Sequence, residues 1–389
     1  MVPRKPNGTA NETKKERKKP VRRVYEDPIP GRLGNLRERM AENGVSAALV
    51  KSPENRRYFS GFSAEDSQLA ESSGFLLVTE DRKFLLTDGR YTTQALREAP
   101  GYEVVTHGGR DLGEKLKECL PDVKSLAFEA NHVTVGFHNV LKRSLAGVKL
   151  RTLPFSLDVL REVKSPEELE IVRKAVNITE RALADLWAEI EPGVPESWLS
   201  EFLLAKFKEY GSTRPAFPPI VAAGANAAQP HAVPGRKKVS KTEMVVLDLG
   251  ATYRGYASDM TRTYVPKLAS GWQKTIYGIV RDAQLMALDS IKAGVAGAEV
   301  DKVARDHITK HGYGEFFNHS LGHGVGLLVH EEPRLSPHAT SPLKAGSLVT
   351  VEPGIYLPEK GGVRLEELVL VTETGCVVLN KDKHFYDFS

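Results

Sequence analysis

The sequence predicts an α+β protein in which two globular domains follow a polar N-terminal segment. Strand-like and helical segments alternate across residues 31–157, a pattern typical of a small α/β domain. Residues 158–389 contain long amphipathic helices and several apolar, strand-like runs, which indicate a second and larger α+β domain. The chain has 389 residues, enough for two separate hydrophobic cores.

Residues 1–30 are predicted to form a basic, disordered tail. Residues 1–23 hold nine Lys or Arg and two Glu, a balance of +7, and few apolar side chains. Because the whole chain carries +4, the remainder carries −3, so its charge gives no reason to expect nucleic acid as a partner. The tail is interpreted as solvated, with contact to nucleic acid or an acidic partner as the alternative.

The remaining composition favours a globular protein of the cytoplasm. No apolar run approaches about 18 residues, so no membrane span is expected. The N-terminus lacks the apolar segment of a secretory signal. Cys119 and Cys376 are far apart and not in a metal-binding spacing, which favours a reducing compartment.

In the first domain, helical spacing at 33–45 ends near Gly44 and is followed by a strand at 46–50. A hairpin is expected at 74–91, with its turn at 80–83. Further strands are expected at 103–107, 125–129 and 148–153.

The second domain is predicted to begin with a long helix. Ser165 fits an N-cap, Pro166 the first helical position and Glu168 the partner in a capping box. This helix is expected to continue to Gly193. Further helices are predicted at 198–211 and 271–291, and strands at 218–224, 243–253, 258–265, 348–357 and 362–373.

Acidic residues recur in the strand-like segments of this domain. Asp248 directly follows an apolar run, and Asp259 comes eleven residues later in another strand-like stretch. An ionised carboxylate in such surroundings is costly unless a cation compensates it. The same region holds further candidates for a site, namely His319, His323, His330, Glu352 and Glu366.

Two divalent cations would neutralise the four carboxylates, with one imidazole as a fifth ligand. Oxygen-rich ligation without a thiolate suits Mn²⁺, Co²⁺, Fe²⁺ or Zn²⁺, and the ligands alone do not select among them. The sequence therefore predicts a dinuclear metal site.

Four ordered motifs, DLGATYRGYASDMTRT, HSLGHGVGLLVHEEP, VEPGIY and GVRLEELVLVTETG, resemble the metal-binding strands of the pita-bread metallopeptidases. The similarity is greater to the Xaa-Pro branch, the prolidases and Xaa-Pro aminopeptidases, because NRRYFSGF, LLTDGRYTTQA and SPEELEIVRKA are similar to its N-terminal domain and interdomain helix. The resemblance implies a C-terminal pita-bread catalytic domain, a smaller N-terminal domain, a homodimer and two metal ions per chain, with manganese preferred.

The resemblance also implies roles for the metal ligands. Asp248 resembles the chelating ligand of one metal, and Asp259 and Glu366 resemble bridging carboxylates. His323 and Glu352 resemble the ligands of the second metal. Adjacent residues of a strand point to opposite faces, so only one of Glu366 and Glu367 can join the site, and the family pattern selects Glu366.

Three residues are the implied catalytic groups. Glu352 is expected to take a proton from the attacking water and pass it to the leaving nitrogen. His330 is expected to contact the substrate amide, and His231 to stabilise the intermediate. His319 and Arg364 resemble residues around the prolyl end of the substrate; the alternative for both is that they only orient metal ligands.

The implied function is hydrolysis of the bond between an N-terminal residue and a following proline, by attack of a metal-bridging hydroxide. One alternative is a same-fold hydrolase or lyase acting on another small amino-acid derivative, or a methionine aminopeptidase. A second is a non-catalytic pita-bread module that binds peptides, against which the intact ligand set counts. The sequence leaves open whether dipeptides (as for a prolidase) or longer peptides (as for an aminopeptidase) are preferred.

Overall fold

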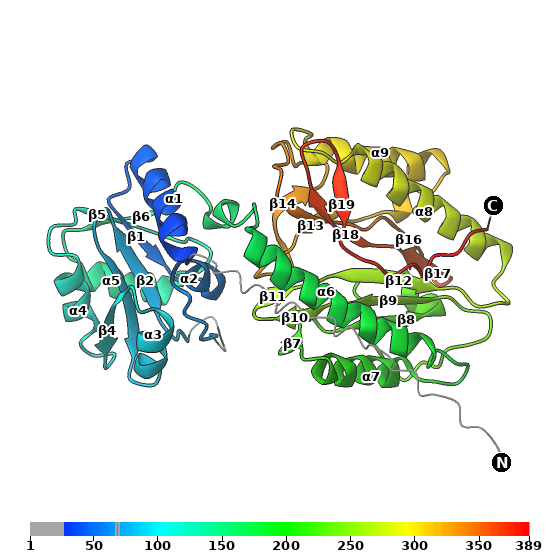
Figure 1. The fold of residues 1–389 in the computed structure, drawn as a ribbon, viewed down its shortest axis with the longest axis horizontal. Coiled ribbons are helices and arrows are strands. Elements are labelled where there is room, and N and C mark those ends of the chain that lie inside the picture. The colour runs from blue at the N-terminus through cyan, green and yellow to red at the C-terminus, as the bar shows by residue number, and fades with distance from the viewer. Residues whose placement is uncertain (1–26, 67, 69–70, 389) are drawn as a thin grey trace, which may run out of the picture.

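The computed structural model describes residues 27–66, 68 and 71–388 and shows two halves joined by a short segment that leads into one long helix, α6 (Pro166–Trp187) (Figure 1). The basic stretch of the predicted tail therefore lies outside the described residues. The first described helix begins at Ile29, inside the range predicted for the tail.

The N-terminal half is a six-stranded sheet covered by helices on both faces. The strand order is β4-β3-β2-β1-β5-β6, and β1 pairs parallel with β5 but antiparallel with β2. Its helices are α1 (Ile29–Glu42), α2 (Pro53–Ser60), α3 (Thr92–Glu98), α4 (Leu112–Cys119) and α5 (Val135–Ser144). Its strands are β1 (Ala47–Val50), β2 (Phe75–Thr79), β3 (Lys83–Asp88), β4 (Glu103–His107), β5 (Ser125–Phe128) and β6 (Lys149–Thr152).

Strand β1 shows why this sheet needs two helical layers. Ala48 and Val50 pack with α1 and α2, whereas Ala47 and Leu49 pack with α4 and α5. A strand that is buried on both faces has an apolar run without alternation, as the predicted strand at 46–50 does.

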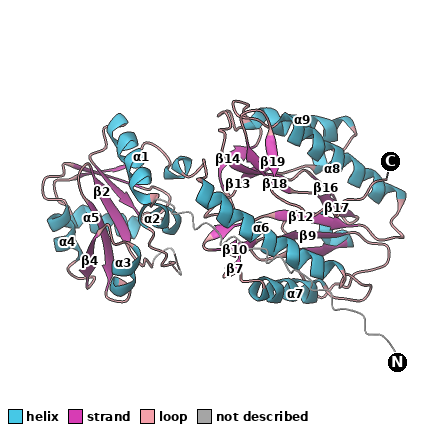
Figure 2. Cartoon of the chain, viewed as in Figure 1, coloured by secondary structure: helices cyan, strands magenta, loops and turns pink. Residues whose placement is uncertain are grey.

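The C-terminal half begins after a short 3₁₀ turn, η1 (Leu157–Leu160), and encloses its sheets between two pairs of helices (Figure 2). The helices are α6 (Pro166–Trp187), α7 (Glu196–Glu209), α8 (Gly271–Ser290) and α9 (Gly297–Lys310), with 3₁₀ turns η2 (Gly224–Ala228) and η3 (Gly314–Phe316).

The strands of this half form four sheets, β12-β9-β8, β14-β13-β15-β18-β19, β16-β17 and β11-β10-β7. Their bounds are β7 (Arg214–Pro215), β8 (Ile220–Ala223), β9 (Val245–Leu249), β10 (Ala251–Tyr253), β11 (Tyr256–Ala257), β12 (Met260–Tyr264), β13 (Gly322–Gly324), β14 (Glu331–Leu335), β15 (Leu348–Val351), β16 (Gly354–Leu357), β17 (Gly361–Arg364), β18 (Glu367–Val371) and β19 (Cys376–Val378). Helices α6 and α7 pack on β8, β9 and β10, and helices α8 and α9 pack on β14 to β18.

Helix α6 confirms the predicted N-terminus and corrects the predicted end. The capping box between Ser165 and Glu168 is present, with Pro166 in the first turn. The helix ends at Trp187 rather than Gly193, because the following backbone turns, with Glu189 N donating to the Leu186 carbonyl at 2.9 Å. Helix α9 was not predicted.

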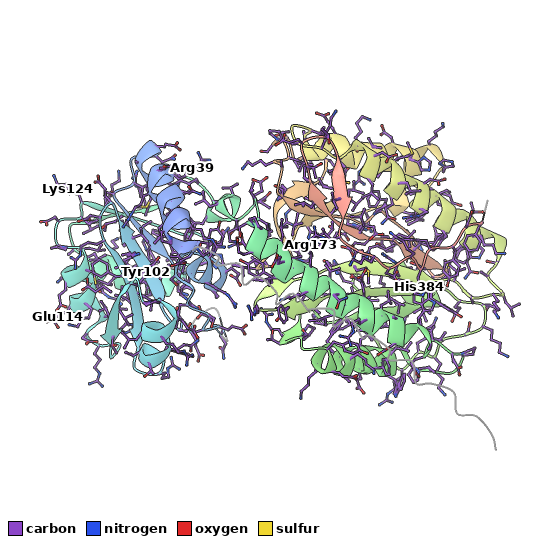
Figure 3. All side chains as sticks on the ribbon, in the orientation of Figure 1. Arg39, Tyr102, Glu114, Lys124, Arg173 and His384 are labelled. Carbon is purple, nitrogen blue, oxygen red and sulfur yellow. The ribbon has the colours of Figure 1, made fainter. Side chains whose placement is uncertain are left out.

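Charged side chains such as Arg39, Glu114 and Lys124 project from the outer surface of the N-terminal half, whereas Tyr102 is buried (Figure 3). The hydroxyl of Tyr102 donates to the Phe59 carbonyl at 2.8 Å. Within the described residues, none of the helices combines the length and the apolar character needed to cross a membrane.

Candidate metal centre and active site

Strands β9 and β12 bring Asp248 and Asp259 onto one face. In β9, Leu247 and Leu249 pack against α6 and α7, so the alternation of the strand turns Asp248 to the opposite face. The antiparallel register sets Asp248 opposite Thr261 and Leu249 opposite Met260, the residue after Asp259. The two carboxylates predicted to share a cation are therefore neighbours across the ladder.

Strand β13 brings His323 toward these carboxylates from another sheet. Its Nε2 lies 3.1 Å from Glu352 Oε1 and 3.7 Å from Asp259 Oδ2. Glu352 directly follows β15, and its Oε1 also accepts a hydrogen bond from Thr350 Oγ1 at 3.0 Å. His323 N donates to the same Thr350 hydroxyl at 3.0 Å, so one threonine orients both predicted ligands.

The glycines on either side of His323 allow this close approach. A Cβ at Gly322 would lie 2.0 Å from the Thr350 carbonyl oxygen, and a Cβ at Gly324 would lie 2.2 Å from that of Glu332. The pairing of β13 with β14 also shifts register between His323 and Gly324, a bulge of the kind that re-aims side chains next to functional sites.

Glu366 completes the cluster from the segment between β17 and β18. Its backbone N donates to the Thr261 carbonyl at 3.1 Å, and its Oε2 accepts from Thr261 Oγ1 at 2.8 Å. Glu367 points the other way, toward Arg262 Nη2 at 3.3 Å. The prediction that these two glutamates face opposite sides is confirmed. Ligand-type atoms of Asp259, His323 and Glu366 all lie within 4.8 Å of one another.

Three buried carboxylate oxygens of this cluster have no hydrogen-bond partner: Asp248 Oδ1, Asp259 Oδ1 and Glu366 Oε1. Buried acceptors are normally paired, so each of these needs a compensating group. Burial raises the pKa of Asp259 and of Glu366 well above the ordinary values, and repulsion from the neighbouring carboxylates adds to it. Burial also raises the pKa of Asp248, and Arg364 opposes that shift.

The imidazole of His323 presents the lone pair of Nε2 to this carboxylate cluster. Its Nδ1 lies 3.1 Å from the Gly324 carbonyl, which can only accept, so Nδ1 carries the proton. Nε2 therefore carries a lone pair and faces carboxylate oxygens. The lone pair and these oxygens repel each other unless a cation lies between them. These residues therefore fit a cluster of divalent metal ions.

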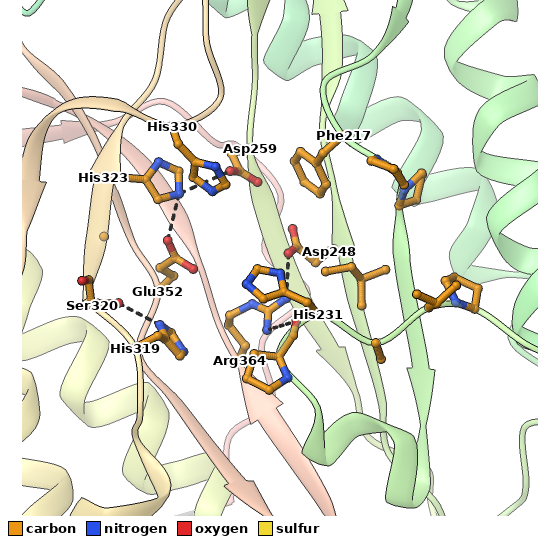
Figure 4. Close-up of a pocket in the computed structure, with 18 of the residues that line it drawn as sticks. Phe217, His231, Asp248, Asp259, His319, Ser320, His323, His330, Glu352 and Arg364 are labelled. Carbon is orange, nitrogen blue, oxygen red and sulfur yellow. Dashed lines mark hydrogen bonds and ion pairs between the residues drawn. The ribbon is translucent and has the colours of Figure 1, made fainter. Parts of the chain in front are cut away.

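The cluster forms the floor of a cavity of about 600 Å³ (Figure 4). His319, His323 and Glu352 line one side of it, and His231, Asp248 and Arg364 face them. Asp259 and His330 also line the cavity, whereas Glu366 lies beneath its floor and is 1% exposed. Thus all the predicted site residues meet at one place. An apolar wall is contributed by Phe217, Pro218, Pro219, Ile220 and Val233.

A chain of hydrogen bonds, buried at Tyr356 and Arg364, connects His319 with Asp248. The Nδ1–H of His319 donates to the Ser320 carbonyl at 2.8 Å, so its Nε2 accepts from the Tyr356 hydroxyl at 2.8 Å. The same hydroxyl accepts from Arg364 Nη1 at 3.0 Å. Arg364 Nη2 in turn donates to Asp248 Oδ2 at 2.6 Å. Burial lowers the pKa of His319 and raises that of Tyr356 to about 12, which keeps both groups neutral.

His330 and His231 are exposed at the mouth of the cavity. The rings of His330 and His323 meet edge to face, with centroids 4.3 Å apart. Partial desolvation in the cleft is the largest cause that lowers the pKa of His330, to about 4. His330 is therefore a neutral imidazole near pH 7, able to donate from one nitrogen and accept at the other.

Sequence reasoning missed Tyr356, Thr261 and Thr350, which orient the predicted ligands. The signal for Thr261 and Thr350 was strand alternation, since each lies two residues from a predicted ligand and therefore on the same face. No sequence signal distinguishes Tyr356 from an ordinary buried tyrosine.

Comparison with known proteins places this arrangement in a family. The family description "Creatinase/Prolidase N-terminal domain" matches residues 32–163, and "Metallopeptidase family M24" matches residues 170–373. An Xaa-Pro dipeptidase of Pyrococcus horikoshii is 36% identical over 355 residues, which cover 91% of this chain and 98% of that relative.

Solved structures agree with these matches. The Xaa-Pro dipeptidase from Bacillus anthracis has a TM-score of 0.84 at 36% identity, covering 91% of this chain and 98% of that one. The X-Pro aminopeptidase from Thermotoga maritima has a TM-score of 0.79 at 36% identity, covering 89% and 98%. The predicted fold class is confirmed. Because the peptidase match spans the half of the chain that carries the carboxylate cluster, and relatives match nearly its whole length, the chain belongs to metallopeptidase family M24.

Proposed function

We propose that this protein is a dinuclear metal-dependent exopeptidase that hydrolyses the bond between an N-terminal residue and a following proline. The observation that carries the proposal is the convergence of four carboxylates and one imidazole at the base of an open cavity, three of them and the imidazole lining it and Glu366 buried below, with three carboxylate oxygens unpaired. Relatives named as Xaa-Pro dipeptidases, matched over nine-tenths of the chain, supply the substrate class.

Asp248, Asp259, His323, Glu352 and Glu366 would hold the two cations. When bound, divalent cations lower the pKa of water to give a nucleophile at neutral pH and polarise the scissile carbonyl. Mn²⁺ is the metal we favour, and Co²⁺, Zn²⁺ and Fe²⁺ also suit this ligand set.

The residues around the metals have separate tasks. Glu352, oriented by Thr350, accepts the proton of the attacking water and delivers it to the leaving nitrogen. His330 and His231, at the cavity mouth, donate hydrogen bonds to the substrate amide and to the oxyanion. His319 and Arg364 lie toward the prolyl end, and Arg364 also holds Asp248 in place.

The chemistry of the substrate fits this design. An Xaa-Pro bond lacks the N–H that many proteases require, and the proline ring fixes the backbone angle φ. Metal ions held by this cluster would act on the carbonyl, so the missing N–H would not prevent hydrolysis. The apolar wall that includes Phe217 and Ile220 suits a proline ring or an apolar first residue.

We extend the proposal to the organisation of the chain. Residues 31–157 form the smaller domain and residues 158–389 the catalytic domain, behind a basic tail over residues 1–30. A homodimer is expected from the family resemblance. A cytoplasmic location agrees with the free thiols of Cys119 and Cys376.

The proposal is tested with protein stripped of metal by chelator and reloaded with Mn²⁺. We expect it to cleave Ala-Pro or Ala-Pro-Ala but not Ala-Ala, and the preferred peptide separates a dipeptidase from an aminopeptidase. Asp259→Asn should abolish cleavage, whereas Asp306→Asn, an exposed acid of α9 paired with Lys302, should leave it unchanged. Cleavage without added metal, or equal cleavage of Ala-Ala, would contradict the proposal.

A further inference from the structure

Glu331 is a buried carboxylate directly after His330, at the start of β14, and it is 3% exposed. Its Oε1 accepts from Lys164 Nζ at 2.7 Å, and its Oε2 lies 3.2 Å from Arg161 Nη2. Both cations are buried and belong to the segment that connects the two halves of the chain. The two cationic side chains lie 170 and 167 residues from Glu331 in the sequence. Burying three charged groups together costs desolvation energy, so the contacts that compensate this cost are specific.

The carboxylate of Glu331 also occupies the inside of the loop 325–330, which connects His323 to His330. A Cβ at Gly326 would lie 2.2 Å from Glu331 Oε1, so only glycine leaves room for it. Leu328 N lies 3.4 Å from Glu331 Oε2, and Gly326 N donates to the Leu328 carbonyl at 2.9 Å. The path of this loop is therefore shaped around the carboxylate.

The contacts continue from Arg161 into the N-terminal half. Arg161 Nη1 donates to Asn55 Oδ1, and Asn55 Nδ2 donates to Glu129 Oε1 at 2.6 Å. Glu129 Oε2 accepts from Ser52 N, the cap of α2, at 2.8 Å. One connected set of buried polar groups thus leads from the N-terminal sheet to the loop that carries His330.

We propose that Glu331 is a positioning residue for His330, and that Arg161 and Lys164 hold it in place, so that the interdomain segment forms part of the active site. The inference rests on the proposed function, in which His330 contacts the substrate amide. Its physical basis is that His330 is exposed at the end of this loop, so that the path of the loop sets where its imidazole lies. A displacement of about 1 Å in such a group can cost about 100-fold in rate.

The first test is hydrogen–deuterium exchange on the metal-loaded full-length protein. Glu331→Gln keeps the shape of the side chain and removes its charge. We expect faster exchange of the amides of 325–330 in this variant. The control is Lys344→Met, which breaks the ion pair between Lys344 and Glu162, a residue of the interdomain segment. This change does not alter a contact of the loop, so the amide exchange of 325–330 should stay unchanged.

The second test is a double-mutant cycle measured on Ala-Pro. Glu331→Gln should lower kcat about 10- to 100-fold, with KM and metal content unchanged. In a His330→Ala background it should have no further effect on kcat, because Glu331 acts through His330. Arg161→Lys, which keeps the charge with fewer donors, should lower kcat less than Arg161→Met, which removes it.

The inference would be overturned if Glu331→Gln left the amide exchange of 325–330 unchanged. It would also be overturned if the effects of Glu331→Gln and His330→Ala on kcat multiplied in the double variant. If Glu331→Gln does not fold, Arg161→Lys and Arg161→Met decide by the same two measurements. If the wild-type protein cleaves no Xaa-Pro peptide, the proposed function fails, while the exchange comparison still decides whether Glu331 positions the loop.

Discussion

Arg364 Nη2 donates to Asp248 Oδ2 at 2.6 Å, which leaves Asp248 Oδ1 buried and unpaired. Three of the other four N–H donors of this guanidinium are also engaged, with Thr261 Oγ1 at 3.2 Å, the Pro230 carbonyl at 3.1 Å and the Tyr356 hydroxyl at 3.0 Å. Arg364 therefore orients a predicted metal ligand, and these contacts support the orienting part of its predicted role.

The first prediction concerns this pair. Arg364→Met removes the hydrogen bond that orients Asp248, so metal affinity and kcat should each fall about 10- to 100-fold. Arg364→Lys keeps the charge but loses the planar geometry and should recover only part of the loss. Titration calorimetry with Mn²⁺ measures the affinity. Wild-type affinity in Arg364→Met would show that Asp248 does not depend on the arginine.

The second prediction concerns the hydroxyl of Tyr356. Tyr356→Phe keeps the ring but leaves His319 Nε2 and one Arg364 donor without their partner, at a cost of about 1–3 kcal/mol in the free energy of unfolding. We expect kcat to fall about tenfold with metal content retained. Denaturant unfolding and steady-state kinetics on the same samples check both effects, and an unchanged kcat would limit the hydroxyl to a structural role.

The third prediction is that the metal-free cluster destabilises the fold. Asp259→Asn should raise the free energy of unfolding of the metal-free protein by about 1–3 kcal/mol, because it removes one of several buried, mutually repelling acids. Metal should then stabilise the wild type, by about 2.7 kcal/mol at 100 times Kd, but not the variant. Thermal unfolding with and without Mn²⁺ gives both results. A metal-free variant less stable than the metal-free wild type would refute the repulsion argument.

The fourth prediction concerns the close packing beside His323. Gly322→Ala places a methyl group 2.0 Å from the Thr350 carbonyl oxygen and should cost about 1–3 kcal/mol of stability, and also weaken metal binding. Gly278→Ala in α8 is the matched control, because nothing lies within 4 Å of its Cβ position. That variant should be neutral or stabilised by up to about 1 kcal/mol. Urea unfolding of the two variants, side by side, distinguishes local crowding from a general effect of alanine.

The sequence predicted the elements whose signals are local. The capping box at Ser165 and the hairpin at 74–91 depend on residues a few positions apart, and both are present in the structure. Strand alternation indicated that only one of Glu366 and Glu367 enters the site, and the structure has Glu366 there. The family resemblance brought in His231 and Arg364, which no periodicity singles out.

Contacts between distant segments were not predictable. The bridge that Tyr356 makes between His319 and Arg364 depends on how a loop packs against β16 and β17. The burial of Glu331 against Arg161 and Lys164 depends on contacts across 167 and 170 residues, and in the sequence these residues resemble ordinary surface charges. The β-bulge at His323 lies where the backbones of β13, β14 and β15 approach one another closely. In the sequence, this approach is indicated only by the glycines on either side of His323.

The most direct measurement of the central claim is a Mn²⁺ titration of metal-stripped protein, with bound metal and Ala-Pro hydrolysis recorded at each point. A dinuclear peptidase predicts two tightly bound ions per chain in the wild type, activity that rises with their binding, and loss of both in Asp259→Asn. Activity that is complete before a second ion binds would contradict the dinuclear site, and hydrolysis without bound metal would contradict the account as a whole.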